Sequence, residues 1–264
     1  MNNAIGVFDS GVGGLTVARE IMRQLPNETI YYFGDVKNCP YGDKTKEEII
    51  KNTDRAVKFL IDKGVKLVVL ACNTATAAAL DYLQNKYEVP IIGVVQPGAR
   101  RAIQATENNK VLVLGTKFTA NSKVYDIEIE NINSDIIVFD KACPAFVPFI
   151  ESEGNLDKEA TKNLISDTLG KTNMLGVDTV VLGCTHYPIL KKDIEDYYGN
   201  NIKVISSGRE AAREVSTVLG YAKLHQKKLN KKEHRFFISQ ESDNFDSIAS
   251  KWLKKDINAE VVEI

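Results

Sequence analysis

Short apolar runs alternate along the chain with segments of helical period. The helical segments include residues 46–63 and 157–174, where apolar positions recur every three or four residues. Several of the apolar runs contain no polar position, as expected for strands of a parallel sheet that is covered on both faces. Together they predict α/β architecture with doubly wound, largely parallel sheets. The predicted strands are residues 4–8, 29–33, 67–71, 91–94, 111–114, 136–139, 179–182, 204–205 and 236–238.

An internal repeat divides the pattern in two. Residues 68–74 (VVLACNT) resemble residues 180–186 (VVLGCTH), and each motif places a cysteine just beyond a predicted strand. Upstream of each motif lies another strand that ends in small polar residues, at 5–10 and at 111–116. The matching order predicts two similar α/β domains, one of residues 1–96 plus 207–264 and one of residues 97–206. The place of the last segment in the first domain is a hypothesis.

These strand ends are the expected location of a ligand site. Open α/β sheets bind ligands outside the carboxyl ends of their strands. If the two domains face one another across a cleft, Cys72 and Cys184 flank it. A helix that starts after each cysteine would stabilise its thiolate. The alternative is that each cysteine is a small apolar residue at the end of a buried strand, but its recurrence favours a chemical role.

Composition narrows the classes of function. The chain has 264 residues, 34 basic and 35 acidic, and a net charge of −1, so no long-range field favours nucleic acid or an anionic membrane. Four cysteines without a C-x-x-C motif argue against a disulfide scaffold, and no cluster predicts a metal. The N-terminus lacks signal-peptide features and the apolar runs have strand length. We therefore expect a cytoplasmic protein with reduced thiols.

Other segments carry candidate polar groups. The loop 9–14 (DSGVGG) has threonine at position 16, where a dinucleotide loop needs glycine, so it is expected to open a helix at Leu15 with backbone N–H groups available to a carboxylate. Asp9 is a candidate acid or base, or else a helix cap. His186 is a candidate proton partner, or else a surface residue. Residues 144–151 form an apolar stretch that ends in Glu151.

Two further segments have plain alternatives. Residues 39–42 (CPYG) predict a rigid turn, which either contacts a ligand or only joins elements. Cys39 and Cys143 lack the repeated strand-end context, and we interpret both as structural. A lysine-rich stretch predicts a solvated loop, with Lys227, Lys228, Lys231 and Lys232.

At these residues the chain resembles a known family, the glutamate racemases of the cofactor-independent amino-acid racemase group. The resemblance implies interconversion of L- and D-glutamate without pyridoxal phosphate, other cofactors or metal, and a supply of D-glutamate for peptidoglycan. The family is often dimeric, which implies a homodimer. The blocks that carry the resemblance are residues 8–17, 40–42, 71–75, 146–148 with Glu151, and 183–188.

The resemblance also implies roles for single residues. Cys72 and Cys184 match the two acid/base catalysts on opposite faces of the substrate α-carbon, with Cys72 taking the proton from D-glutamate and Cys184 from L-glutamate. Asp9 matches the partner of Cys72, while Glu151 and His186 match partners of Cys184. The matched substrate contacts are Ser10, Pro40, Tyr41, Gly42, Asn73, Thr74, Thr116, Thr119 and Thr185.

Two segments depart from the family pattern. Residues 35–38 read DVKN where the family more often has DTAR, and residues 206–208 read SSG where it more often has DSG. Two other functions stay open. One is a racemase for aspartate or a related amino acid, and the other is a two-lobed amino-acid binding protein, against which the missing signal peptide counts.

Overall fold

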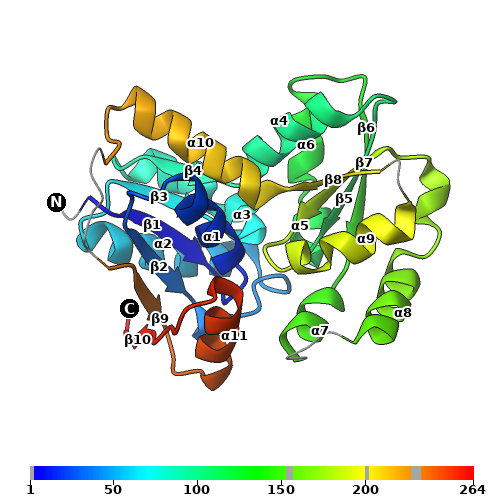
Figure 1. The fold of residues 1–264 in the computed structure, drawn as a ribbon. Helices are drawn as coiled ribbons and strands as arrows, with labels where there is room; N and C mark the ends of the chain where they lie inside the picture. The colour runs from blue at the N-terminus through cyan, green and yellow to red at the C-terminus, as the bar shows by residue number, and fades with distance from the viewer. Residues whose placement is uncertain (1–2, 153–156, 200–201, 227–232) are drawn as a thin grey trace. The chain divides into compact units, whose positions relative to one another are not determined.

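The computed structural model describes residues 3–152, 157–199, 202–226 and 233–264, so the four lysines of the predicted solvated loop lie outside the described residues. Two compact units make up the chain. The first unit contains Met1–Val94 and Gly208–Ile264, and the second contains Val95–Ser207. Each unit holds one parallel sheet with helices around it, which confirms the predicted α/β architecture (Figure 1).

The first unit is built on a six-stranded sheet in the order β10-β9-β2-β1-β3-β4, and all its strand pairs are parallel. Its strands are β1 (Ile5–Asp9), β2 (Ile30–Gly34), β3 (Leu67–Leu70), β4 (Ile91–Gly93), β9 (Arg235–Ile238) and β10 (Glu260–Val261). Its helices are α1 (Leu15–Gln24), α2 (Lys46–Asp62), α3 (Asn73–Lys86), α10 (Ser207–Tyr221) and α11 (Asp243–Leu253), with a short 3-10 turn η1 (Val36–Asn38).

Both faces of the middle of this sheet are buried, which explains why its central strands β1, β2 and β3 are mostly apolar. Side chains alternate between the two faces along a strand. One face, with Ile5 and Val7, forms a core with apolar residues of α1, α10 and α11. On the other face Phe33 packs against Phe59 of α2, with ring centroids 5.4 Å apart.

The second unit is built on a four-stranded parallel sheet in the order β6-β5-β7-β8. Its strands are β5 (Lys110–Gly115), β6 (Ile137–Ala142), β7 (Thr179–Gly183) and β8 (Lys203–Ser206). Its helices are α4 (Val95–Ala105), α5 (Lys117–Asn121), α6 (Val124–Glu130), α7 (Phe146–Ser152), α8 (Lys158–Leu169) and α9 (Lys191–Tyr198), with 3-10 turns η2 (Thr172–Leu175) and η3 (Tyr187–Leu190).

The two sheets share one winding order. Strands β2-β1-β3-β4 in the first unit correspond to β6-β5-β7-β8 in the second. The two cysteine motifs follow β3 and β7, which are equivalent strands in this order. The sequence repeat is therefore also a repeat of topology. The C-terminal segment extends the first sheet, because β9 pairs with β2.

Three local features differ from the sequence expectations. The helix predicted over residues 157–174 ends at Leu169, because Gly170 takes a φ of +53° that side chains rarely adopt, and η2 follows. Cys184 is followed by the 3-10 turn η3 instead of an α-helix. The last two elements, α11 and β10, have no counterpart among the predicted elements. Among the described residues, no helix is long and apolar enough to cross a membrane.

Candidate active site

Each sheet has one point where the winding reverses, between its first and third strands. In the first unit this point lies between β1 and β3, and in the second it lies between β5 and β7. Loops diverge there to opposite faces of the sheet and leave room for a ligand at the carboxyl ends of the strands. Asp9 and Cys72 come from the first of these points, and Thr116 and Cys184 from the second. Each unit thus holds its candidate cysteine at its own winding reversal.

Cys72 is the N-cap residue of α3. Its Sγ accepts a hydrogen bond from the backbone N–H of Ala75 at 3.4 Å and lies 3.7 Å from Ser10 Oγ. The thiol is only 6% exposed. Free N–H groups and the positive end of the helix dipole favour the thiolate over the thiol. The first turn of α3 also carries Asn73 and Thr74, both buried.

Asp9 is held rigidly at the end of β1. Its carboxylate accepts a hydrogen bond from Gly11 N–H at 3.0 Å, and the hydroxyl of Tyr32 donates to Gly11 O at 2.7 Å. Burial, followed by the charges of Asp9 and Cys72, raises the pKa of Tyr32 well above its usual value, so this hydroxyl stays a donor. A Cβ on Gly14 would lie 2.4 Å from the Cβ of Asp9, so only glycine fits there.

Tyr41 in the predicted turn points its side chain into the first unit. It is 2% exposed, its ring lies 6.2 Å from that of Phe8, and its hydroxyl donates to Asp35 Oδ2 at 2.6 Å. Burial and the neighbouring Asp35 carboxylate raise the pKa of Tyr41 far above its usual value. The phenol is therefore committed to Asp35. The turn, with Pro40 exposed and Gly42 partly exposed, presents its backbone instead.

The second unit contains a chain of three polar groups around Cys184. The Sγ of Cys184 lies 3.9 Å from His186 Nδ1, and His186 Nε2 lies 2.7 Å from Glu151 Oε1 on α7. Burial acts to lower the pKa of His186, but its contacts with Cys184 and Glu151 outweigh burial and raise it to about 10. These contacts therefore favour the imidazolium over the neutral imidazole. A cation beside a thiol favours the thiolate.

The candidate threonines of the second unit lie after β5, in α5 and after β7. Thr116 caps α5, where its Oγ1 accepts from Thr119 N–H at 3.2 Å and donates to Thr119 Oγ1 at 3.1 Å. Thr119 and Thr185 are buried. Tyr187 was absent from the predicted set, yet its hydroxyl donates to Gly115 O and to a second backbone carbonyl. It thereby ties the segment after Cys184 to the end of β5.

The other two cysteines have different surroundings. Burial raises the pKa of Cys143 to about 12, so its thiol is neutral, and it lies 3.6 Å from the carbonyl of Lys141. Cys39 is partly exposed and its Sγ lies beside Gly11, 3.3 Å from where a Cβ would be. In the part of the chain that the structure describes, no group of three or more His, Cys, Asp or Glu side chains is arranged to hold a metal ion.

A comparison with family models gives one match across most of the chain. The model described as Asp/Glu/hydantoin racemase matches residues 5–215. The chain belongs to the Asp/Glu/hydantoin racemase family. The matched region of the chain includes Cys72, Cys184 and every other candidate residue described above.

Similar proteins narrow the comparison inside the racemase family. Glutamate racemase from Staphylococcus haemolyticus is 47% identical over 264 residues, which cover 100% of this chain and 99% of the relative. The crystal structure of a glutamate racemase isoform from Bacillus anthracis has a TM-score of 0.94 at 40% identity and covers 99% of this chain and 98% of the solved one. Glutamate racemase from Francisella tularensis in complex with D-glutamate has a TM-score of 0.91 at 34% identity, with 100% and 98% covered.

Proposed function

We propose that the protein is a glutamate racemase that interconverts L- and D-glutamate with two cysteine thiols and supplies D-glutamate for peptidoglycan. The observation that carries this proposal is the repeated thiol, one at the equivalent strand end of each unit, in a chain that matches glutamate racemases over its full length. The Francisella structure holds D-glutamate, and its full-length similarity to this chain supports the same substrate here.

The chemistry of inversion explains why two thiols are needed. The α-proton of an amino acid is a very weak acid, so its removal requires a base aligned with the C–H bond and groups that stabilise the negative charge. In the proposed reaction one cysteine thiolate takes the α-proton and becomes a thiol. The opposite thiol then gives its proton to the other face of the carbanion and becomes a thiolate. Two groups of similar acidity invert the α-carbon without reorienting the substrate.

The remaining residues have supporting roles in this proposal. Cys72 acts on D-glutamate with Asp9 as its partner, and Cys184 acts on L-glutamate with His186 and Glu151 as its partners. The two thiols are prepared differently, because Cys72 caps an α-helix and Cys184 lies next to an imidazolium. Hydroxyl, amide and backbone groups bind the two substrate carboxylates, and they are supplied by Ser10, Pro40, Tyr41, Gly42, Asn73, Thr74, Thr116, Thr119 and Thr185.

Location and assembly follow from the same proposal. None of the four cysteines is in a disulfide, and a thiol catalyst must stay reduced, so we infer action in the reducing cytoplasm. The substrate is a small molecule. A homodimer is expected by resemblance, and sedimentation equilibrium of the purified protein measures it directly.

The test is racemisation in deuterium oxide without added cofactor. With L-glutamate we expect loss of optical activity and one solvent deuteron at the α-carbon of the product, whereas L-aspartate stays optically active. Cys72→Ser and Cys184→Ser should each abolish net racemisation. Cys143→Ser is the matched control, because its neutral, buried thiol takes no part, and it should keep full activity. Turnover of aspartate alone, or full activity in either Cys72→Ser or Cys184→Ser, contradicts the proposal.

A further inference from the structure

Asp35 is a buried carboxylate that the proposed mechanism does not use. It follows β2 directly and is 1% exposed. Its backbone N–H donates to Asp9 O at 3.0 Å, which fixes it to the end of β1. Its Oδ2 accepts from the hydroxyl of Tyr41 at 2.6 Å, and both carboxylate oxygens accept from Asn38 Nδ2 at 3.0 Å. One residue thus connects the strand end that carries Asp9 with the turn that carries Tyr41.

We infer that Asp35 is a positioning residue for glutamate, which sets the place of the turn 40–42 relative to Asp9 through its bond to Tyr41. This inference rests on the proposed function. A charge-assisted hydrogen bond between two buried groups is among the stronger side-chain contacts. Because the Tyr41 phenol is held by Asp35, the turn contributes to ligand binding through its main chain.

The main chain of the turn is available for that purpose. The N–H groups of Tyr41 and Gly42 have no acceptor among the described residues, while Tyr41 O accepts from Lys44 N–H at 3.2 Å. Successive backbone N–H groups in a turn form a concave site that binds anions such as carboxylates. The direction in which these N–H groups point depends on how the Tyr41 side chain is anchored. Loss of the hydrogen bond to Asp35 should therefore weaken binding of the substrate carboxylate.

The thiol of the first unit has contacts of its own. The Sγ of Cys72 accepts from the N–H of Ala75 and lies 3.7 Å from Ser10 Oγ, and neither contact passes through Asp35 or Tyr41, although the charge of Cys72 also acts on the Tyr41 phenol. Loosening the turn should therefore leave the reacting thiol in place. An interaction that binds ground state and transition state alike affects KM and leaves kcat unchanged.

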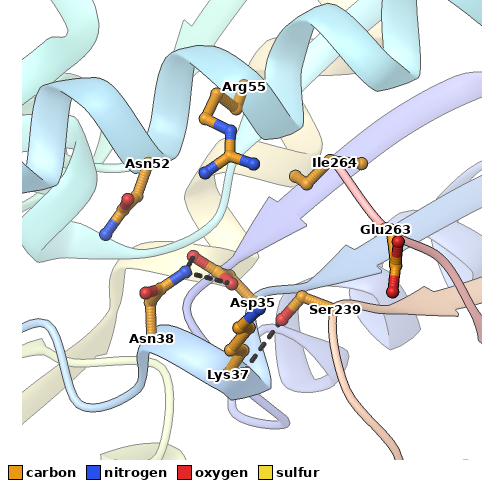
Figure 2. Close-up of a pocket in the computed structure, with 8 residues that line it drawn as sticks. All are labelled: Asp35, Lys37, Asn38, Asn52, Arg55, Ser239, Glu263 and Ile264. Atoms are coloured by element: carbon orange, nitrogen blue, oxygen red, sulfur yellow. Dashed lines mark hydrogen bonds between the residues drawn. The ribbon is translucent and has the colours of Figure 1, made fainter.

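The surroundings of Asp35 offer matched controls. Asp35 and Asn38 line a cavity of about 340 Å³ together with residues of α2, of the segment after β9 and of the C-terminus (Figure 2). Lys37 and Arg55 line the same cavity, but among the described residues the side-chain donors to the Asp35 carboxylate are Asn38 and Tyr41 alone. Changes at Lys37 or Arg55 alter the charge near Asp35 without breaking the anchor.

The experiment compares Asp35→Asn and Tyr41→Phe with Lys37→Ala and Arg55→Ala. We expect the first two to raise KM for glutamate about five- to tenfold in both directions, with kcat within about twofold of the unchanged protein. Tyr41→Phe removes the donor of the bond, whereas Asp35→Asn keeps an acceptor oxygen and removes its charge. The double variant Asp35→Asn/Tyr41→Phe should therefore resemble Tyr41→Phe, in which the bond is already absent. The two cavity controls should keep KM within about twofold.

Binding is measured separately with racemic glutamate by titration calorimetry. A racemic mixture is already at equilibrium, so no net reaction contributes heat, and the Kd should rise in parallel with KM. A merely structural role would instead lower kcat through a smaller folded fraction at constant KM and Kd. The inference is wrong if Tyr41→Phe keeps the KM and Kd of the unchanged protein, or if the cavity controls raise them equally. If the unchanged protein neither racemises nor binds glutamate, the proposed function itself fails.

Discussion

Replacing Glu151 with glutamine is expected to lower the pKa of His186 and so to reduce the positive charge beside the Cys184 thiol. His186 Nε2 lies 2.7 Å from Glu151 Oε1, and the imidazole is buried while Glu151 is partly exposed. Glutamine keeps the size and one acceptor oxygen of the side chain but removes the negative charge. The imidazolium then keeps Cys184 as its remaining charge partner.

The structure sets the size of this effect. Although burial lowers the pKa of His186, the contacts with Cys184 and Glu151 raise it from an ordinary 6.5 to about 10, so the Glu151 carboxylate is one of two groups that favour the imidazolium. A hydrogen bond to a charged group contributes about 1.5–3 kcal/mol. Glu151→Gln should therefore lower the pKa of His186 by about one to two pH units.

Proton–nitrogen NMR of the histidine side chains measures this pKa directly, since the chain has three histidines and His225 and His234 serve as internal references. Unfolding adds a second measurement. Because the folded pKa of His186 is raised, its stabilising contribution is fully present below pH 6.5 and is lost as the pH rises through about 10. Urea unfolding should thus separate Glu151→Gln from the unchanged protein at pH 6, and the gap should shrink above pH 10.

Two results would refute this reasoning. In one, His186 of the unchanged protein titrates near its ordinary pKa of about 6.5, so that the neutral imidazole predominates at pH 7. In the other, the pKa of His186 is the same with and without the Glu151 carboxylate. Glu195→Gln provides the matched control, because it removes a partly exposed carboxylate of the same unit whose salt bridge, to Lys191, does not involve His186.

Two other substitutions test how the first unit is held together. Gly14→Ala should displace Asp9, because the new Cβ would lie 2.4 Å from the Asp9 Cβ and 2.9 Å from Tyr32 Oη. We expect urea unfolding to show a loss of about 1–3 kcal/mol in stability, and the assay to show a lower kcat. Unchanged stability together with an unchanged kcat would contradict the close packing. Lys66→Met should lower the free energy of unfolding by about 3–5 kcal/mol at pH 7, because it leaves the buried Glu28 without its salt-bridge partner at 2.6 Å. Racemisation by the folded fraction should stay the same. A loss of stability below about 1 kcal/mol would contradict the buried ion pair.

Hydrophobic patterning predicts most of the strands because burial on both faces leaves an unmistakable apolar run. β3 and β7 are buried along their whole length, and both were predicted within one residue of their observed ends. β10 is a two-residue edge strand with both residues exposed, so it has no apolar run to detect. Pattern alone therefore finds the strands that contain an apolar run, including the edge strands β4, β6 and β8, and misses β10.

The repeated cysteine motif predicts location better than local structure. Parallel topology brings both cysteines to equivalent strand ends, as the repeat indicates. The same repeat suggests a helix after each cysteine, yet the chain after Cys184 forms a 3-10 turn that contains Pro188. Here Tyr187 donates to backbone carbonyls of two other segments, and such long-range contacts have no signature in local spacing.

The contacts that orient the site are the least predictable from the sequence. The Tyr41–Asp35 bond joins two residues of one irregular loop, where no periodicity applies. Glu151 and His186 are 35 residues apart, and their pairing depends on how α7 packs after β6. The resemblance to a family named Glu151 and His186, whereas the contact of Asp35 with Tyr41 emerges only from the structure.

The two thiols have different surroundings, since Cys72 caps a helix and Cys184 lies beside His186, but this difference cannot change the ratio of kcat/KM between the two directions. Enantiomers in water have equal free energies, so kcat/KM must be the same in both directions at every pH. A helix N-terminus stabilises the Cys72 thiolate through N–H groups that do not titrate, whereas the imidazolium beside Cys184 is lost as the pH rises through about 10. Any asymmetry must therefore appear in kcat and KM separately, with compensating changes. A pH profile of kcat that differs between the two directions, at equal kcat/KM, is the signature expected of two thiols activated by different means.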